Sequence, residues 1–208
     1  MQYLPLILTA TVINLLAAIS PGPDFLMCVR NSVSYSRRAG VYSGVGISMG
    51  LMVHMFYCSV GIGLIIAKSI LVFNIIKYLG AAYLIYIGVG AILSKKQQVS
   101  FEDKNNNTDL TAFQAIKTGF LTNLLNPKAT LFFLAFFPMV LSPGTPAWVV
   151  LTVACIIVLT ALVWFSIVAT LFSNAWIRER YLRFQRAINS LFGGLLIAIG
   201  IKIALSGR

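Results

Sequence analysis

The chain has 208 residues, of which 59% are hydrophobic and only 10% are Asp, Glu, Lys or Arg. A soluble domain carries about 25% charged residues, and a chain of this length cannot hide so much apolar surface in one core. The mean hydropathy of +0.89 excludes an ordinary soluble domain and indicates a polytopic membrane protein. At ~20 residues for each span, the length allows about six transmembrane helices.

The net charge is +11, from 16 basic and 5 acidic residues. In a soluble protein this excess would suggest a nucleic-acid partner, but here the basic residues flank apolar runs, where they set orientation in a membrane. We therefore expect contact with a lipid bilayer and no nucleic acid. The isolated cysteines Cys28, Cys58 and Cys155 show no CxxC or metal-ligand spacing, so we expect no disulfide framework, no metal site and no cofactor.

Six hydrophobic runs follow one another along the chain. The first lacks a basic leader and a small-residue cleavage site, so we interpret it as a retained span rather than a signal peptide. The segment SKKQQVSFEDKNNNTDLT, after the third run, is too polar to pack a core. We expect a first three-helix repeat at 1–93, a cytoplasmic polar linker at 94–112 and a second three-helix repeat at 113–208. The expected spans cover about 3–28, 40–67, 70–93, 113–140, 146–173 and 187–205.

Basic residues gather in the first, third and fifth connections between the spans. The positive-inside rule predicts that these connections are cytoplasmic and that both termini lie outside. The fifth connection, NAWIRERYLRFQRAI, alternates Arg with aromatic residues and is typical of a helix at the anionic inner surface; a gating role is a second interpretation. The basic residues on the expected inner side are Arg30, Arg37, Arg38, Lys95, Lys96, Lys104, Lys117, Arg178, Arg180, Arg183 and Arg186, against Lys68, Lys77, Lys202 and Arg208 opposite.

The two halves show weak internal similarity. The segment SPGPDFL from Ser20 aligns with NPKATLF from Asn126, and the span from Leu79 aligns with the span from Leu191. Because each half has three spans, an odd number, the halves must sit in opposite orientations, as in many secondary transporters. We therefore expect an all-α membrane protein with two inverted three-helix repeats.

The first and fourth spans each contain a predicted break near the middle of the membrane. Ser20-Pro21 and Asn126-Pro127 each place a capping residue before a proline, which is how helices begin. A break inside a span survives where its backbone groups line a cavity or are buried in protein. A simple proline kink is the alternative, but two breaks at matching positions, each followed by a charge, favour a site.

The charges beside the breaks are Asp24 and Lys128. A charge at the centre of a bilayer costs on the order of 2.5–3.5 kcal/mol, and repeat symmetry would allow the two to pair. They are either a structural ion pair or a site in which Asp24 binds an ammonium or a proton and Lys128 binds a carboxylate, together with the N–H groups of the half-helix starts. An amino acid presents both poles.

Other polar residues have two readings each. His54, the only histidine, could relay protons or hydrogen-bond a neighbouring helix. Asn14 and Asn123 could line the path or join helices, and Asn126 is favoured for the site. The candidate substrate- and proton-binding residues are Ser20, Pro21, Gly22, Pro23, Asp24, His54, Asn126, Pro127 and Lys128. The spacing Gly40-x3-Gly44-x3-Ser48, with Gly46-x3-Gly50, favours close helix crossing.

The segments SPGPDFLMCVRNSVSYSRRAGVYSGVGISMG and TNLLNPKATLFFLAFFP resemble the LysE/RhtB family of bacterial amino-acid exporters, and the resemblance covers essentially the whole chain. It implies efflux of an amino acid or close derivative across the bacterial inner membrane, driven by proton antiport. The segment around SPGPDF and RRAG is closer to the homoserine/threonine branch than to the lysine/arginine branch. The family motif places functional residues at Pro21, Gly22, Pro23, Asp24, Asn126, Pro127 and Lys128.

Alternatives remain open at this point. An exporter of another small solute or of a metal ion could share the topology, although a metal carrier favours clusters of His, Cys, Asp or Glu. An enzyme needs a nucleophile with its base or a metal with its ligands, and neither pattern is present, so we expect no enzyme. A non-transporting membrane subunit and a homodimer are both compatible with the sequence. There is no GxxxxGK[ST] loop, which argues against ATP-driven transport by this chain.

Overall fold

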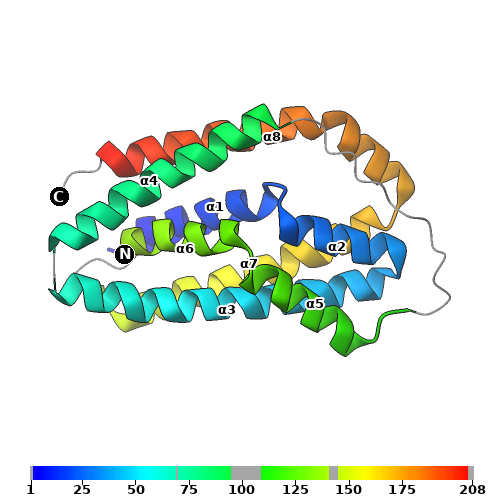
Figure 1. The fold of residues 1–208 in the computed structure, drawn as a ribbon, viewed down its shortest axis with the longest axis horizontal. Helices are drawn as coiled ribbons and strands as arrows, with labels where there is room; N and C mark the ends of the chain where they lie inside the picture. Colours follow the sequence, from blue (N-terminus) through cyan, green and yellow to red (C-terminus); the bar gives the residue numbers. More distant parts are fainter. Residues whose placement is uncertain (1, 69, 95–108, 141–144, 206–208) are drawn as a thin grey trace.

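The computed structural model describes residues 2–68, 70–94, 109–140 and 145–205. Most of the expected linker, 95–108, therefore lies outside the described residues, together with Lys95, Lys96, Lys104 and Arg208. The described ranges form eight helices, shown in Figure 1. They are α1 (Leu4–Ile19), α2 (Pro23–Ser34), α3 (Arg37–Lys68), α4 (Ile70–Leu93), α5 (Ala112–Leu124), α6 (Pro127–Val140), α7 (Ala147–Phe172) and α8 (Ala175–Leu205).

The helices have the lengths and composition of membrane spans. Four of them, α3, α4, α7 and α8, are long and apolar enough to cross a bilayer individually. The pairs α1–α2 and α5–α6 each qualify when taken together, with bends of 55° and 58° at their breaks. Counting each bent pair as one span gives the six spans that the sequence predicts, with the first and fourth broken.

Each half of the described chain has the same order of elements: a bent pair and then two long helices. Figure 1 shows that α1–α2 and α5–α6 run in opposite directions, with the two breaks beside each other near the middle of the molecule. As a result α1 packs against α6 and α2 against α5, while α4 lies along α8. This is the inverted arrangement of two three-helix units that the odd number of spans requires.

The first break differs from the prediction. Ser20 does not cap the second half-helix; it ends α1, with its backbone N–H donating to the Leu16 carbonyl. Ser20 is extended because it precedes a proline. Helix α2 begins at Pro23 with Gly22 as its extended N-cap and without a side-chain cap. The pair that starts the helix is therefore Gly22-Pro23, two residues after Ser20-Pro21.

The second break follows the prediction. Asn126 precedes α6, and its side-chain Oδ1 accepts a hydrogen bond of 3.0 Å from the backbone N–H of Lys128. Pro127 occupies the first helical position, where its missing N–H costs nothing. Asn126 therefore has the capping role that the sequence assigned to it.

Apolar packing fixes the long helices around the two breaks. In α7 the buried positions recur every three or four residues, which gives the helix one inward stripe, while Leu151, Leu159 and Val163 stay exposed. Exposed leucine and valine on the opposite face suit a surface solvated by lipid chains. The inward residues are Val149, Val153, Ile157, Ala161, Phe165, Val168, Ala169 and Phe172.

Glycines allow the closest helix crossings. A Cβ atom on Gly44 would lie 2.8 Å from Phe165 Cβ of α7, and one on Gly46 would collide with the Ile116 carbonyl of α5. The glycine spacing in α3 therefore serves packing within the chain, as predicted. The α4–α8 crossing uses the same device, because a Cβ on Gly193 would collide with the Gly88 carbonyl.

The last predicted span, 187–205, is shorter than the helix that contains it. The sequence predicts a helix at the inner membrane surface for the basic and aromatic segment 174–188, and a span that starts at about 187. Instead α8 begins at Ala175 and continues without a break to Leu205. Asn174 caps its start, because its Oδ1 accepts from the Trp176 N–H at 2.9 Å.

The Gly193→Ala substitution tests the α4–α8 crossing. The added methyl group has no room there, so we expect the free energy of unfolding to fall by about 1–3 kcal/mol. Gly194→Ala is the matched control, because a Cβ at Gly194 has no heavy atom within 4 Å; alanine should be neutral or stabilise the helix by up to about 1 kcal/mol. Thermal unfolding of both variants in detergent checks this, and equal melting temperatures would contradict the close crossing.

Candidate functional site

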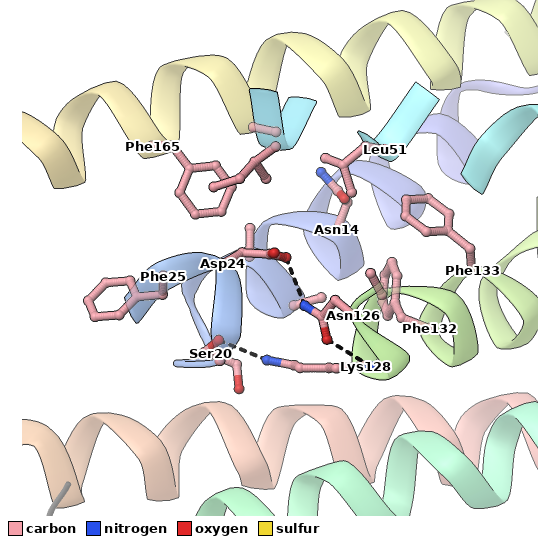
Figure 2. A pocket seen from close by; sticks show the side chains of 16 residues that line it. Asn14, Ser20, Asp24, Phe25, Leu51, Asn126, Lys128, Phe132, Phe133 and Phe165 are labelled. Atoms are coloured by element: carbon pink, nitrogen blue, oxygen red, sulfur yellow. Dashed lines mark hydrogen bonds between the residues drawn. The ribbon is translucent and has the colours of Figure 1, made fainter. Parts of the chain in front are cut away.

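The two breaks border one cavity of about 60 Å³, which we call the central cavity. Figure 2 shows Asp24 and Asn126 converging on it from α2 and from the break before α6, with Lys128 and Ser20 at its edge. Ser20, Gly22, Asp24, Asn126 and Lys128 all line it. Five candidate residues from two halves of the chain, about one hundred positions apart, are thus brought together by the inverted arrangement.

The Asp24 carboxylate is held by two asparagine side chains of the other half. Its Oδ2 accepts a hydrogen bond of 2.9 Å from Asn123 Nδ2 and one of 3.0 Å from Asn126 Nδ2. Its Oδ1 is buried and has no hydrogen-bond partner among the described residues. A buried carboxylate oxygen without a donor is costly, so this atom is ready to receive one from a ligand or to hold a proton.

The Lys128 ammonium does not form the structural ion pair that was one of the two alternatives for Asp24 and Lys128. Its Nζ donates to the Ser20 carbonyl at 2.8 Å, across the first break. The carboxylate of Asp24 is bonded by amides instead, so the two charges share a cavity without a direct hydrogen bond between them. A Cβ on Gly22 would lie 3.3 Å from Lys128 Cδ, so the glycine leaves space for the lysine side chain to reach Ser20.

His54 lies behind the site. Its Nε2 is 3.0 Å from the Asn123 carbonyl, and its Nδ1 is 2.6 Å from the Tyr57 hydroxyl. Since a carbonyl can only accept, the neutral ring carries its proton on Nε2 and accepts from Tyr57 at Nδ1. The ring stacks on Phe133 at 5.8 Å. His54 is therefore placed to orient Asn123, the residue that holds Asp24, and it is not among the residues that line the central cavity.

One further polar atom faces this site without a partner. Asn14 of α1 lines the cavity, is 5% exposed, and its Nδ2 has no acceptor among the described residues. The central cavity thus combines an unpaired donor, Asn14 Nδ2, with an unpaired acceptor, Asp24 Oδ1. Its other walls are apolar, formed mainly by Phe25, Ile47, Leu51, Phe132, Phe133 and Phe165.

The remaining candidate residues shape the breaks. Pro23 and Pro127 start the two half-helices, and Pro21 lines a neighbouring cavity between the first break, α4 and α8. Asn123 was left open by the sequence, and the structure makes it a direct partner of Asp24. It precedes Asn126 by three residues, but the break at Leu125 separates the two. No group of three or more His, Cys, Asp or Glu that could hold a metal occurs in the described ranges.

Comparison with known proteins identifies the family. The profile of the LysE type translocators matches residues 15–207. The membrane protein YrhP of Bacillus subtilis is 32% identical over 198 residues, covering 90% of this chain and 93% of its own length. The threonine efflux protein of Escherichia coli K12 is 31% identical over 207 residues, covering 98% of this chain and 99% of its own. No solved structure was found to match the chain.

The threonine efflux protein of Salmonella typhimurium is similar to the same degree, with 32% identity over 205 residues that cover 97% of this chain and 98% of its own. The chain therefore belongs to the LysE type translocator family, as its sequence motifs indicated. It is a multi-pass membrane protein of a transporter family.

The Asn126→Ala substitution tests whether one side chain couples the second break to Asp24. It removes the cap of α6 and one donor to the carboxylate, so we expect a loss of about 2 kcal/mol in unfolding free energy. Asn174→Ala is the matched control, since this exposed asparagine only caps α8, and a cap alone contributes about 1 kcal/mol. Thermal unfolding in detergent measures both, and a smaller loss at Asn126 than at Asn174 would contradict the coupling.

Proposed function

We propose that this protein is a secondary active exporter of a neutral polar amino acid of the threonine or homoserine type, driven by proton antiport across the bacterial inner membrane. The observation that carries the proposal is the Asp24 carboxylate: one of its oxygens is buried without a partner in the described part of the chain, in a cavity that Lys128 also lines. The threonine efflux proteins of two enterobacteria, similar over nearly the full chain, support the substrate class.

The poles of the site match those of a zwitterion. Asp24 Oδ1 is the acceptor for a substrate ammonium. Asn14 Nδ2 is a donor for the carboxylate, and the start of α2, which has no side-chain cap, adds backbone N–H groups with a positive helix dipole. The positive charge of Lys128 favours the same end of the substrate. An α-amino acid presents an ammonium and a carboxylate on one carbon, so both ends are satisfied at once.

Proton coupling follows from the same carboxylate. When the substrate leaves, Asp24 Oδ1 loses its only donor, and a proton can take that place. Substrate and proton then compete for one atom, which is the condition for antiport. The two inverted halves rock around the breaks in alternating access. The outward half of each cycle carries a substrate and the return half carries a proton, so a complete cycle exchanges one for the other.

The ends of the helices support the predicted orientation. The α2–α3 turn, the start of α5 and the α7–α8 junction lie at one end of the molecule, and the start of α1 and the end of α8 lie at the other (Figure 1). The basic residues of the first and fifth connections belong to the first of these ends. We infer from the positive-inside rule that this end faces the cytoplasm.

The Asp24→Asn substitution tests the coupling role. The amide keeps the shape but cannot hold a proton or a full negative charge, so proton-driven export of threonine should fall by at least about a hundredfold. Export is measured in cells loaded with a threonine-containing dipeptide, at equal amounts of protein in the membrane. Asp109→Asn is the control, because Asp109 is exposed and bonds Ser36 outside the cavity.

Retained proton-coupled export in Asp24→Asn would contradict the role of Asp24. Export of other zwitterions or of metal ions by the wild-type chain, with no export of threonine or homoserine, would overturn the substrate class. An uncoupler distinguishes the energy source, since antiport stops when the proton gradient collapses.

The orientation is tested with two single cysteines in a chain whose native cysteines are replaced by alanine. Ala147→Cys lies at the start of α7 and Glu179→Cys in the first turns of α8, and both positions are exposed. A membrane-impermeant maleimide applied to intact cells should label Ala147→Cys and spare Glu179→Cys. Permeabilised cells, in which both should react, are the control, and the reverse pattern in intact cells contradicts the orientation.

A further inference from the structure

A second cavity lies beside the central cavity, on the other side of the Ser20–Lys128 hydrogen bond. Its volume is about 300 Å³, five times that of the central cavity. It is bounded by the last turns of α4, the first half of α8 and the first break, so it lies toward the basic end of the molecule. Ser20 and Lys128 line both cavities. We call this second space the side chamber.

The side chamber contains amide oxygens that lack donors. Gln185 and Asn189, one helical turn apart on α8, line it and are only 2% and 3% exposed. Asn189 Nδ2 donates to Ser94 Oγ at 2.7 Å, and Ser94 Oγ donates to the Ala91 carbonyl at 2.7 Å. These two hydrogen bonds use donor groups only, so Asn189 Oδ1 stays buried without a partner among the described residues. Gln185 Oε1 is likewise buried without one.

Two unpaired buried acceptors in one helical face point to a ligand that brings donors. Packing alone does not explain them, because apolar side chains of the same size would avoid the cost of leaving amide oxygens unpaired. Lys128 supplies the opposite pole, an ammonium at the other wall of the chamber. The chamber thus has a cationic group for a carboxylate and neutral oxygens for an ammonium, and no carboxylate is among the residues that line it.

We propose that the side chamber is a second zwitterion site, in which an α-amino acid from the cytoplasm binds before it reaches Asp24. Its carboxylate bonds Lys128, and its ammonium bonds Gln185 Oε1 and Asn189 Oδ1. This assignment rests on the proposed export of an amino acid and adds to it a loading step and the residues that perform it.

Because both sites use Lys128, the substrate occupies them one after the other. Lys128 lines both cavities, so the substrate carboxylate stays near it while the substrate ammonium moves from the two amide oxygens to Asp24 Oδ1. The amides are neutral and hold the cationic end less strongly than a carboxylate does. This difference favours movement of the substrate from the side chamber to the central cavity. Because both sites use one lysine, only one of them is occupied at a time.

The test uses the full chain in proteoliposomes, with transport of radiolabelled L-threonine started from the face that carries Glu179. The double variant Gln185→Met/Asn189→Leu keeps the side-chain volumes and removes both acceptors. We expect the KM at that face to rise by about tenfold or more, the loss of one or two charge-assisted hydrogen bonds, with Vmax at saturating threonine within about twofold of wild type.

Two further variants separate this result from damage to the fold. Asn74→Leu removes a carboxamide at the other end of α4 and should leave the KM unchanged. Gln185→Glu replaces the remaining neutral acceptor by a carboxylate, which binds an ammonium more strongly, and should return the KM of an Asn189→Leu chain toward the wild-type value. A double variant with the wild-type KM would contradict the proposal that the side chamber binds substrate. So would a Gln185→Glu/Asn189→Leu chain whose KM does not return toward the wild-type value.

Equilibrium binding distinguishes the chamber from the proposed function. Purified Asp24→Asn protein should still bind L-threonine through the chamber, at one molecule per chain, and should lose binding when Gln185→Met and Asn189→Leu are added. Loss of binding in Asp24→Asn alone overturns the chamber while leaving export through Asp24 in place. Absence of threonine transport by the wild-type chain contradicts the proposed function itself.

Discussion

The fold depends on how a carboxylate and an ammonium find partners inside apolar spans. Asp24 Oδ2 accepts from Asn123 and Asn126, and Lys128 donates to the Ser20 carbonyl, so each charged group is bonded by the opposite half of the chain. An unpaired charge at this depth costs several kcal/mol, so neither half could keep its break and its charge alone. The two broken spans must therefore lie against each other, and the long helices pack around that pair.

The breaks serve bonding and access together. Each ends one half-helix and starts another, which leaves backbone groups that need partners. At the second break the Asn126 side chain does two things: its Oδ1 caps α6 by accepting from the Lys128 N–H, and its Nδ2 donates to Asp24. At the first break Gly22 has no side chain, and this opens the passage for Lys128. The second break is thus capped by the Asn126 side chain, whereas at the first break the Ser20 carbonyl accepts a hydrogen bond from the Lys128 ammonium.

Four buried polar atoms that have no partner among the described residues belong to the two cavities at the first break. Asn14 Nδ2 and Asp24 Oδ1 border the central cavity, and the oxygens of Gln185 and Asn189 belong to residues of the side chamber. A folded protein keeps such groups where a ligand or water satisfies them during function. The membership of the chain in the LysE type translocator family agrees with a path for a small solute along these cavities.

The sequence by itself determined the membrane class, the six spans, their odd number in each half and the two breaks, because hydropathy and proline are local signals. It also marked Asp24 and Lys128, since charges in apolar runs stand out. Tertiary structure alone decided that Gly22-Pro23 starts α2, that Asn123 bonds Asp24, and that Lys128 bonds a carbonyl rather than Asp24. It also joined Gln185 and Asn189 to the first break. Which polar groups meet depends on how segments far apart in the sequence pack against each other, and a local sequence pattern carries no information about that packing.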